Sequence, residues 1–167
     1  MKPGRMLSTL FTALFVFATA VAAAPGTNPA WEKMKSLVGE WDGTMTHGEM
    51  AMPVKVSYAL VSGGTSLMER LTGPGEDMVT MYYPEGTRVR MTHYCSEGNQ
   101  PRMKATGLAG NTLAFDFVDA TNVASPEAEH MRKLVVKFQD ADHFTQEWTH
   151  RKAGKEETGV FKYARKK

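Results

Sequence analysis

Two residues with chemically useful side chains stand two positions apart in this sequence, His93 and Cys95. In an extended strand alternate side chains point to the same side, so this pair lies opposite Arg88 and Arg90. Because arginines favour the solvent-exposed face, we expect His93 and Cys95 to point into the protein. Residues two apart in a strand are separated by about 6.6 Å, which is too far for a direct hydrogen bond and argues against a Cys–His nucleophile.

The same alternation defines an inward-facing surface on the predicted strands 65–71, 77–83 and 143–150. On residues 77–83 it indicates that Val79, Met81 and Tyr83 point inward. The residues expected to contact a ligand are Glu69, Met81, Met91, His93, Cys95, Gln146 and Trp148. A mainly apolar surface with a few polar groups is typical of a pocket for a small apolar molecule. The alternative is a filled core, because small barrels often have room only for side chains.

A metal or haem is the alternative partner for the inward-facing polar residues. His93 and Cys95, together with Glu69 or His47, would then serve a redox protein or an enzyme on the same fold. Two ligands do not make a metal site, however, and the spacing of the pair brings no third ligand with it. We therefore interpret His93 and Cys95 as parts of the interior.

Methionines and a histidine also cluster near the start of the chain's β-rich part, at Met45, His47, Met50 and Met52. Soft ligands of this kind suit copper, but methionine also fills irregular interiors, and packing is the interpretation that we adopt. The sequence has no Gly-rich phosphate loop after a strand, no Gly-x-Ser-x-Gly and no His-Glu-x-x-His. We therefore expect no cofactor, and the sequence favours a binding protein over an enzyme.

The elements that must position these residues are mostly strands. From Glu40 onward apolar and polar residues alternate, and turn residues recur every 8–14 residues. The predicted strands cover residues 40–47, 53–61, 65–71, 77–83, 88–95, 102–107, 111–118, 132–139, 143–150 and 158–164. Consecutive short strands joined by tight turns predict an all-β, closed antiparallel up-and-down barrel of about ten strands, since closure removes exposed edges. A two-sheet sandwich is the alternative, and only residues 119–129 are long enough to cross between its sheets.

One short helix precedes the strands. Asn28 is a helix-capping residue, and Pro29 is suited to the first helical position. Trp31, Met34 and Leu37 then recur at helical spacing, so the helix is expected to end before Gly39.

The first residues have the three parts of a secretory signal: Lys2 and Arg5, an apolar stretch over residues 7–21, and small residues before Pro25. We predict cleavage after Ala23, which gives a signal peptide of residues 1–23 and one β-barrel domain of residues 24–167, located in the periplasm or secreted. The apolar stretch is short for a spanning helix, and no second one follows, so no membrane span is expected after cleavage. An uncleaved N-terminal anchor is the alternative.

Charge and cysteine content narrow the possible partners. Two of the 20 Lys and Arg residues, Lys2 and Arg5, belong to the predicted signal peptide. After cleavage the chain therefore has 18 basic and 18 acidic residues and no net charge. A neutral chain lacks the basic surface of nucleic-acid-binding proteins, so nucleic acid is excluded as a partner.

Cys95 is the only cysteine, so no internal disulfide is possible and the apolar core must stabilise the fold.

The run Gly39-Glu40-Trp41 directly follows the predicted helix and opens the first strand, and it resembles the Gly-x-Trp signature of lipocalins and the wider calycin superfamily. The resemblance implies that the helix closes one barrel end and that Trp41 packs at the barrel base beneath a cation from the last strand, Lys162 or Arg165. The longer runs 39–44, 62–64, 78–83 and 93–103 look like secreted bacterial lipocalin-like proteins and, more distantly, nitrobindin-type barrels. Nitrobindin-like proteins bind haem through a late-strand histidine; predicted strand 158–164 has none, so haem is not expected.

Overall fold

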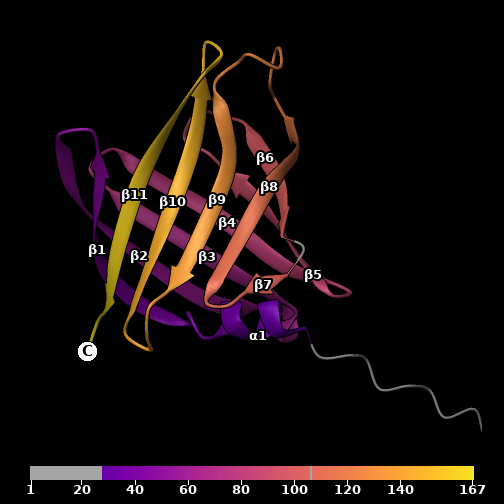
Figure 1. The fold of residues 1–167 in the computed structure, drawn as a ribbon, viewed down its shortest axis with the longest axis vertical. Coiled ribbons are helices and arrows are strands. Elements are labelled where there is room, and N and C mark those ends of the chain that lie inside the picture. Colours follow the sequence, from indigo (N-terminus) through magenta and orange to yellow (C-terminus); the bar gives the residue numbers. More distant parts are fainter. Residues whose placement is uncertain (1–27, 106) are drawn as a thin grey trace, which may run out of the picture.

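The computed structural model describes residues 28–105 and 107–167, which form a closed antiparallel β-barrel of ten strands with one short helix across one end (Figure 1). The helix is α1 (Pro29–Lys35), and a 3-10 turn, η1 (Ser62–Gly64), joins the second and third strands. The barrel strands are β1 (Gly39–His47), β2 (Met50–Val61), β3 (Ser66–Gly73), β4 (Glu76–Glu85), β5 (Arg88–Tyr94), β6 (Gln100–Ala105), β8 (Thr112–Thr121), β9 (His130–Phe138), β10 (His143–Lys152) and β11 (Lys155–Arg165). A two-residue strand, β7 (Leu108–Ala109), pairs with the start of β8.

The strands follow the chain around the barrel, and two pairings close it. β1 pairs with β11 along residues 41–46, and β6 pairs with β8 across the connection that holds β7. All neighbours are antiparallel, and Figure 1 shows β8 to β11 crossing in front of β2 to β5. The predicted barrel is confirmed, and the sandwich alternative is wrong because a single sheet closes on itself.

Of two segments predicted from the sequence, one lies outside the described residues, and the other, a connection, begins later than expected. The predicted signal segment, residues 1–23, lies outside the described residues. Within the described ranges, no helix is long and apolar enough to cross a bilayer. The segment 119–129, which we expected to be a long connection between strands, begins with the end of β8, because this strand continues to Thr121 to pair with β6.

Helix α1 is fixed to the barrel by its capping residue. The Asn28 side-chain oxygen accepts a hydrogen bond from the Trp31 backbone N–H at 3.0 Å, which satisfies a donor of the first turn. The Asn28 amide nitrogen donates to the carbonyl oxygens of Gly86 and Arg88, at the turn between β4 and β5. The helix buries Trp31 and Met34 against the barrel, so the cap sets both the start of the helix and its position.

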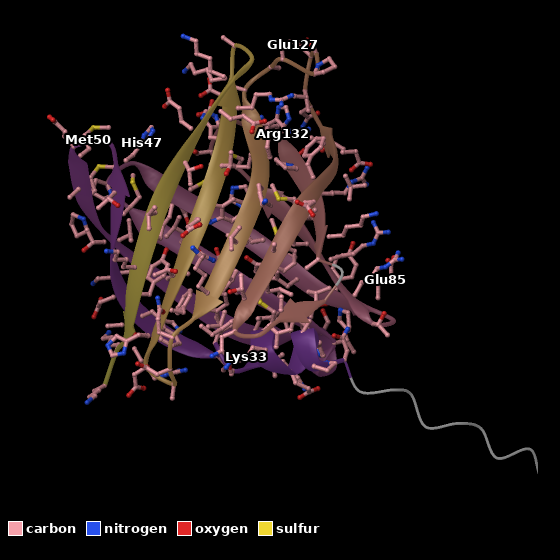
Figure 2. The ribbon with its side chains drawn as sticks, in the orientation of Figure 1. Lys33, His47, Met50, Glu85, Glu127 and Arg132 are labelled. Atoms are coloured by element: carbon pink, nitrogen blue, oxygen red, sulfur yellow. The ribbon has the colours of Figure 1, made fainter. Side chains whose placement is uncertain are left out.

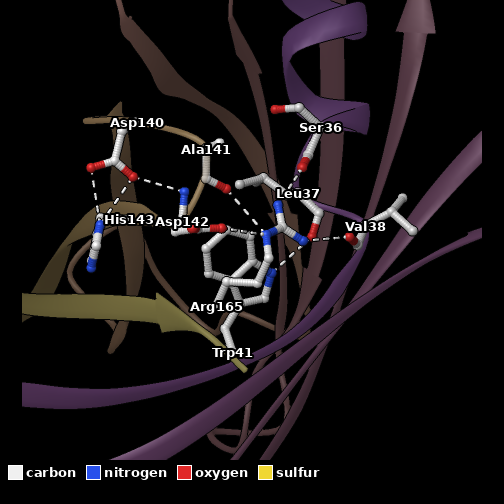
Figure 3. A network of polar contacts seen from close by, with 9 residues as sticks. All are labelled: Ser36, Leu37, Val38, Trp41, Asp140, Ala141, Asp142, His143 and Arg165. Atoms are coloured by element: carbon white, nitrogen blue, oxygen red, sulfur yellow. Dashed lines mark hydrogen bonds and ion pairs between the residues drawn. The ribbon is translucent and has the colours of Figure 1, made fainter. Parts of the chain in front are cut away.

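The barrel end beneath α1 is built around Trp41 and Arg165 (Figure 3). The Arg165 guanidinium carbon lies 4.0 Å from the centre of the Trp41 ring, and its nitrogens donate to the carbonyl oxygens of Ser36, Val38 and Ala141. Trp41 is buried, and its indole nitrogen donates to the Leu37 carbonyl at 2.8 Å. Arg165, rather than Lys162, is therefore the cation above this tryptophan.

The glycine before this tryptophan has its own physical reason. Gly39 adopts a φ of 131°, which side-chain-bearing residues rarely adopt. A Cβ at this position would also stand 2.8 Å from a guanidinium nitrogen of Arg165. The Gly-x-Trp run thus makes room for the cation that covers the tryptophan.

The inward-facing side of β4 differs from the prediction. Its buried residues are Met78, Thr80 and Tyr82, each opposite a buried residue of β3. The prediction that Val79, Met81 and Tyr83 point inward is therefore wrong, because these half-buried side chains lie on the outer face. Both faces of this strand carry apolar residues, so apolar content alone does not show which face points inward. The register with β3 determines it.

Side chains fill the barrel from the α1 end to beyond its middle. Phe144 of β10 stacks on Tyr163 at 4.8 Å between ring centres and meets Trp41 edge-on at 4.7 Å. The inward direction predicted for β3, β5 and β10 is confirmed by the burial of Leu67, Glu69, Leu71, Val89, Met91, His93, Phe144, Gln146 and Trp148. Much of the predicted interior is thus packed core, and open space remains only where this packing stops.

Candidate functional site

A cavity of about 200 Å³ opens at the end of the barrel opposite α1. Its walls come from β1 to β4 on one side, β9 to β11 on the other, and the connection between β5 and β6. The lining residues are Met45, His47, Met52, Val54, Leu71, Pro74, Met78, Cys95, Ser96, Glu97, Met131, Trp148, His150, Glu157, Gly159 and Phe161. Ten of these sixteen have apolar side chains and none is Lys or Arg, so the cavity favours apolar molecules without a negative charge.

The polar lining residues belong to the rim. Figure 2 shows His47 and Met50 at the tip of the β1–β2 hairpin, at the same end as Glu127 and far from Lys33 of α1. The His47 ring nitrogen Nε2 lies 3.0 Å from a carboxylate oxygen of Glu157. A ligand would therefore meet hydrogen-bonding groups at the entrance and apolar walls further in.

Trp148 and His93 separate the cavity from the packed core. The Trp148 ring lines the cavity, and the His93 ring lies against it with 4.7 Å between ring centres. The His93 nitrogen Nδ1 is 2.9 Å from the Thr80 hydroxyl, while its buried Nε2 has no hydrogen-bond partner. Burial lowers the pKa of His93 to about 4, so the imidazole is neutral at physiological pH.

A buried polar network lies deeper in the barrel around Glu69. One Glu69 carboxylate oxygen accepts hydrogen bonds from the hydroxyls of Tyr58 and Tyr82 and from the Gln146 amide, at 2.6, 2.8 and 2.9 Å. Burial raises the pKa of Glu69, although these three donors lower it. The Gln146 carbonyl in turn accepts from the Trp148 indole at 3.3 Å, so the network reaches a wall of the cavity.

The seven residues predicted to contact a ligand lie in five different places. Cys95 and Trp148 line the cavity, and His93 lies directly behind Trp148. Glu69 and Gln146 belong to the buried network, and Met91 is buried in the packed core. Met81 lies on the outer face of β4, for the reason given above. That Cys95 and Trp148 contact a ligand stays a prediction.

Most of the cavity wall was missed by reasoning from the sequence. The prediction interchanged the inner and outer faces of β4, which placed Met78 on the outer face. Met131 lies next to an irregularity in the register between β9 and β10. Met45 and Met52 were noticed as part of a methionine-rich run, yet they were interpreted as packing. Their alternation with Trp41 and Val54 was the signal that places them on the inner face.

The structure does not bring the proposed metal or haem ligands together. Among residues 28–105 and 107–167, no three His, Cys, Asp or Glu side chains are grouped to hold a metal ion. Glu69 is bound within the buried network, and His93 is covered by Trp148. A haem is larger than the cavity, which is itself smaller than the about 300–1,000 Å³ of pockets for drug-sized ligands. His93 and Cys95 therefore fit the walls of the barrel better than a redox centre.

Comparison with known proteins agrees with the barrel architecture. No protein-family model matches the chain, and no curated protein matches it. A solved structure of a protein of unknown function from the DUF3598 family of Nostoc punctiforme is similar over 80% of this chain and 49% of that one, with 11% identity and a TM-score of 0.58. A redesigned β-barrel aligns over 80% of this chain and 94% of its own, with 13% identity and a TM-score of 0.39. The chain spans about half the length of its Nostoc relative in structure, and at this identity the likeness shows a shared barrel fold alone.

Proposed function

We propose that this protein is an exported, lipocalin-like binding protein that holds one small apolar molecule in the cavity at the open end of its barrel. The observation that carries the proposal is the cavity itself, about 200 Å³ with ten apolar lining residues. Cavities of about 150 Å³ hold benzene, so this space suits a ligand of one ring or a short branched chain. Export rests on the signal-like residues 1–23, and a periplasmic or secreted location follows from it.

The charges around the cavity indicate which apolar molecules would bind. Glu97 and Glu157 line the entrance, and the lining contains no Lys or Arg to pair with a carboxylate. A neutral molecule, or one with a hydrogen-bond-donating or cationic end toward the rim, is therefore favoured over a fatty acid. A neutral aromatic alcohol should bind more tightly than the carboxylate of the same size.

The proposal is tested with a neutral one-ring dye, 4-(dimethylamino)benzonitrile, whose fluorescence depends on the polarity of its surroundings. One dye molecule should bind per chain, and Cys95→Phe should abolish binding because the added ring occupies the cavity. Met81→Phe is the matched control, since its ring is added to the outer face of the same barrel. Bound dye should also slow the reaction of Cys95 with a neutral maleimide.

A cavity function is refuted if Cys95→Phe folds normally and leaves the dye affinity unchanged. Should Cys95→Phe unfold the protein, Met131→Phe gives a second test, because Met131 is half-buried at the rim and tolerates a larger side chain more easily. Unchanged dye binding in that variant would likewise contradict the proposal.

A further inference from the structure

The inner face of the β1–β2 hairpin carries four side chains with soft or borderline metal-binding atoms. In the register of this hairpin Met45 stands directly opposite Met52, and His47 stands opposite Met50. Alternation from the buried Trp41 places Met45 and His47 on the inner face, and alternation from Val54 does the same for the other two. Met45, His47 and Met52 all line the cavity described above.

Core packing accounts for only one of these four residues, since Met45 packs against the buried core. The Met50 residue is 59% exposed and the His47 side chain 41% exposed, while Met45 and Met52 are half-buried. Flexible methionines at a solvent-accessible rim add little to stability, because ordering their long side chains costs conformational entropy. Packing therefore explains the position of Met45 but leaves His47, Met50 and Met52 unexplained.

The spacing within the hairpin suits a shared metal ion. Side chains directly opposite each other in an antiparallel pair begin about 4.5–5.5 Å apart at Cβ. Two sulfurs bound to one ion at about 2.3 Å each, the length of a zinc–sulfur bond, are at most about 4.6 Å apart. The three rotatable bonds of methionine allow Met45 and Met52 to place their sulfurs on either side of one ion. His47 lies on the same strand, two residues from Met45.

The contact between His47 and Glu157 leaves one imidazole nitrogen available. The Glu157 carboxylate only accepts hydrogen bonds, so His47 Nε2, at 3.0 Å from it, carries the hydrogen. In the neutral ring the lone pair is then on Nδ1. Metal-binding histidines typically donate their other N–H to a carboxylate in this way, which orients the ring and strengthens the ligand.

We propose that Met45, Met52 and His47 form a binding site for a soft monovalent metal ion, Cu(I) or its redox-inert analogue Ag(I), with Met50 as a further ligand at the rim. Thioether sulfur selects Cu(I) over ions that prefer oxygen, such as Mg²⁺ and Ca²⁺. The nearby carboxylate of Glu157 favours the positive charge of the ion. This inference does not depend on the binding of an apolar molecule.

The site is tested by titrating the purified protein with Ag(I), followed by calorimetry and by NMR of the methionine methyl groups. One Ag(I) should bind per chain and shift the methyl signals of Met45 and Met52. The double variant Met45→Leu/Met52→Leu removes both sulfurs while conserving volume. It should weaken Ag(I) binding by at least about tenfold, since even the outer partners of metal ligands change affinity by about 10–100-fold.

The barrel provides a matched control. Met68 of β3 and Met81 of β4 also stand directly opposite each other, but both lie half-buried on the outer face. The variant Met68→Leu/Met81→Leu should leave Ag(I) affinity unchanged. Glu157→Gln, a change at an exposed position, should weaken binding by about tenfold through His47.

Equal loss of Ag(I) binding in the two double variants would overturn the proposal, because any methionine pair would then suffice. Absence of saturable binding by the unmodified protein would overturn it as well. Leucine keeps the cavity apolar, so Met45→Leu/Met52→Leu should still bind 4-(dimethylamino)benzonitrile. Loss of the metal site and loss of the apolar site are thus distinguishable.

Discussion

Replacement of Arg165 by methionine should destabilise the barrel at its closed end. This guanidinium lies 4.0 Å from the centre of the Trp41 ring, a contact that contributes about 0.5–2 kcal/mol. It also donates to three backbone carbonyl oxygens, those of Ser36, Val38 and Ala141. Water can replace each lost donor at this surface, so each bond contributes about 0.5–1 kcal/mol. Arg165→Met should therefore lower the free energy of unfolding by about 2–5 kcal/mol.

The measurement is urea unfolding followed by tryptophan fluorescence, with the free energy of unfolding extrapolated to water. Arg165→Lys keeps the charge but lacks the planar fork that reaches three carbonyls, so it should lose part of the same stability. Lys166→Met is the neighbouring control: it removes an ion pair with Glu40 in which both side chains are exposed, and such pairs contribute little.

The reasoning is refuted if Arg165→Met loses less than about 0.5 kcal/mol, the size of an ordinary surface substitution. A loss equal to that of Lys166→Met would have the same meaning, because the two changes remove the same charge. Either result would show that the cation over Trp41 does not hold α1 and the last strand together.

Three further predictions concern the buried groups. Trp41→Ala should cost about 3–5 kcal/mol in urea unfolding, as other large truncations in cores do, and a loss below about 1 kcal/mol would contradict its place in the core. Burial raises the folded-state pKa of Glu69 above 4.5, so its contribution to stability should be complete below that pH and lost as the pH rises through the raised value; an unfolding series against pH should become flatter in Glu69→Gln. Burial lowers the folded-state pKa of His93 from 6.5 to about 4, so stability should fall by roughly 3 kcal/mol as the pH drops through this window, and NMR signals of this ring that titrate near pH 6.5 would show that it is not sealed behind Trp148.

The architecture and the barrel base were predictable from local patterns. Asn28 before Pro29 marked the start of α1, and alternation with regular turns predicted consecutive antiparallel strands, because side-chain period and turn chemistry are properties of the local chain. The position of Trp41 after Gly39 indicated a tryptophan at the closed end. The choice between Lys162 and Arg165 required the structure, since both lie on the last strand and only one reaches the ring.

The candidate site depended on tertiary structure to a greater extent. The register of β4 with β3 sets which side chains of β4 point inward, because a shift of one residue exchanges the inner and outer faces. Met78 rather than Met81 therefore reaches the cavity. Where packing stops is equally a property of the whole barrel: the rings of Trp41, Phe144 and Tyr163 fill one end and leave space at the other. The sequence by itself determined which residues could face inward on most strands. Only the closed barrel decided which of them meet, because the cavity wall is assembled from strands that are distant along the chain.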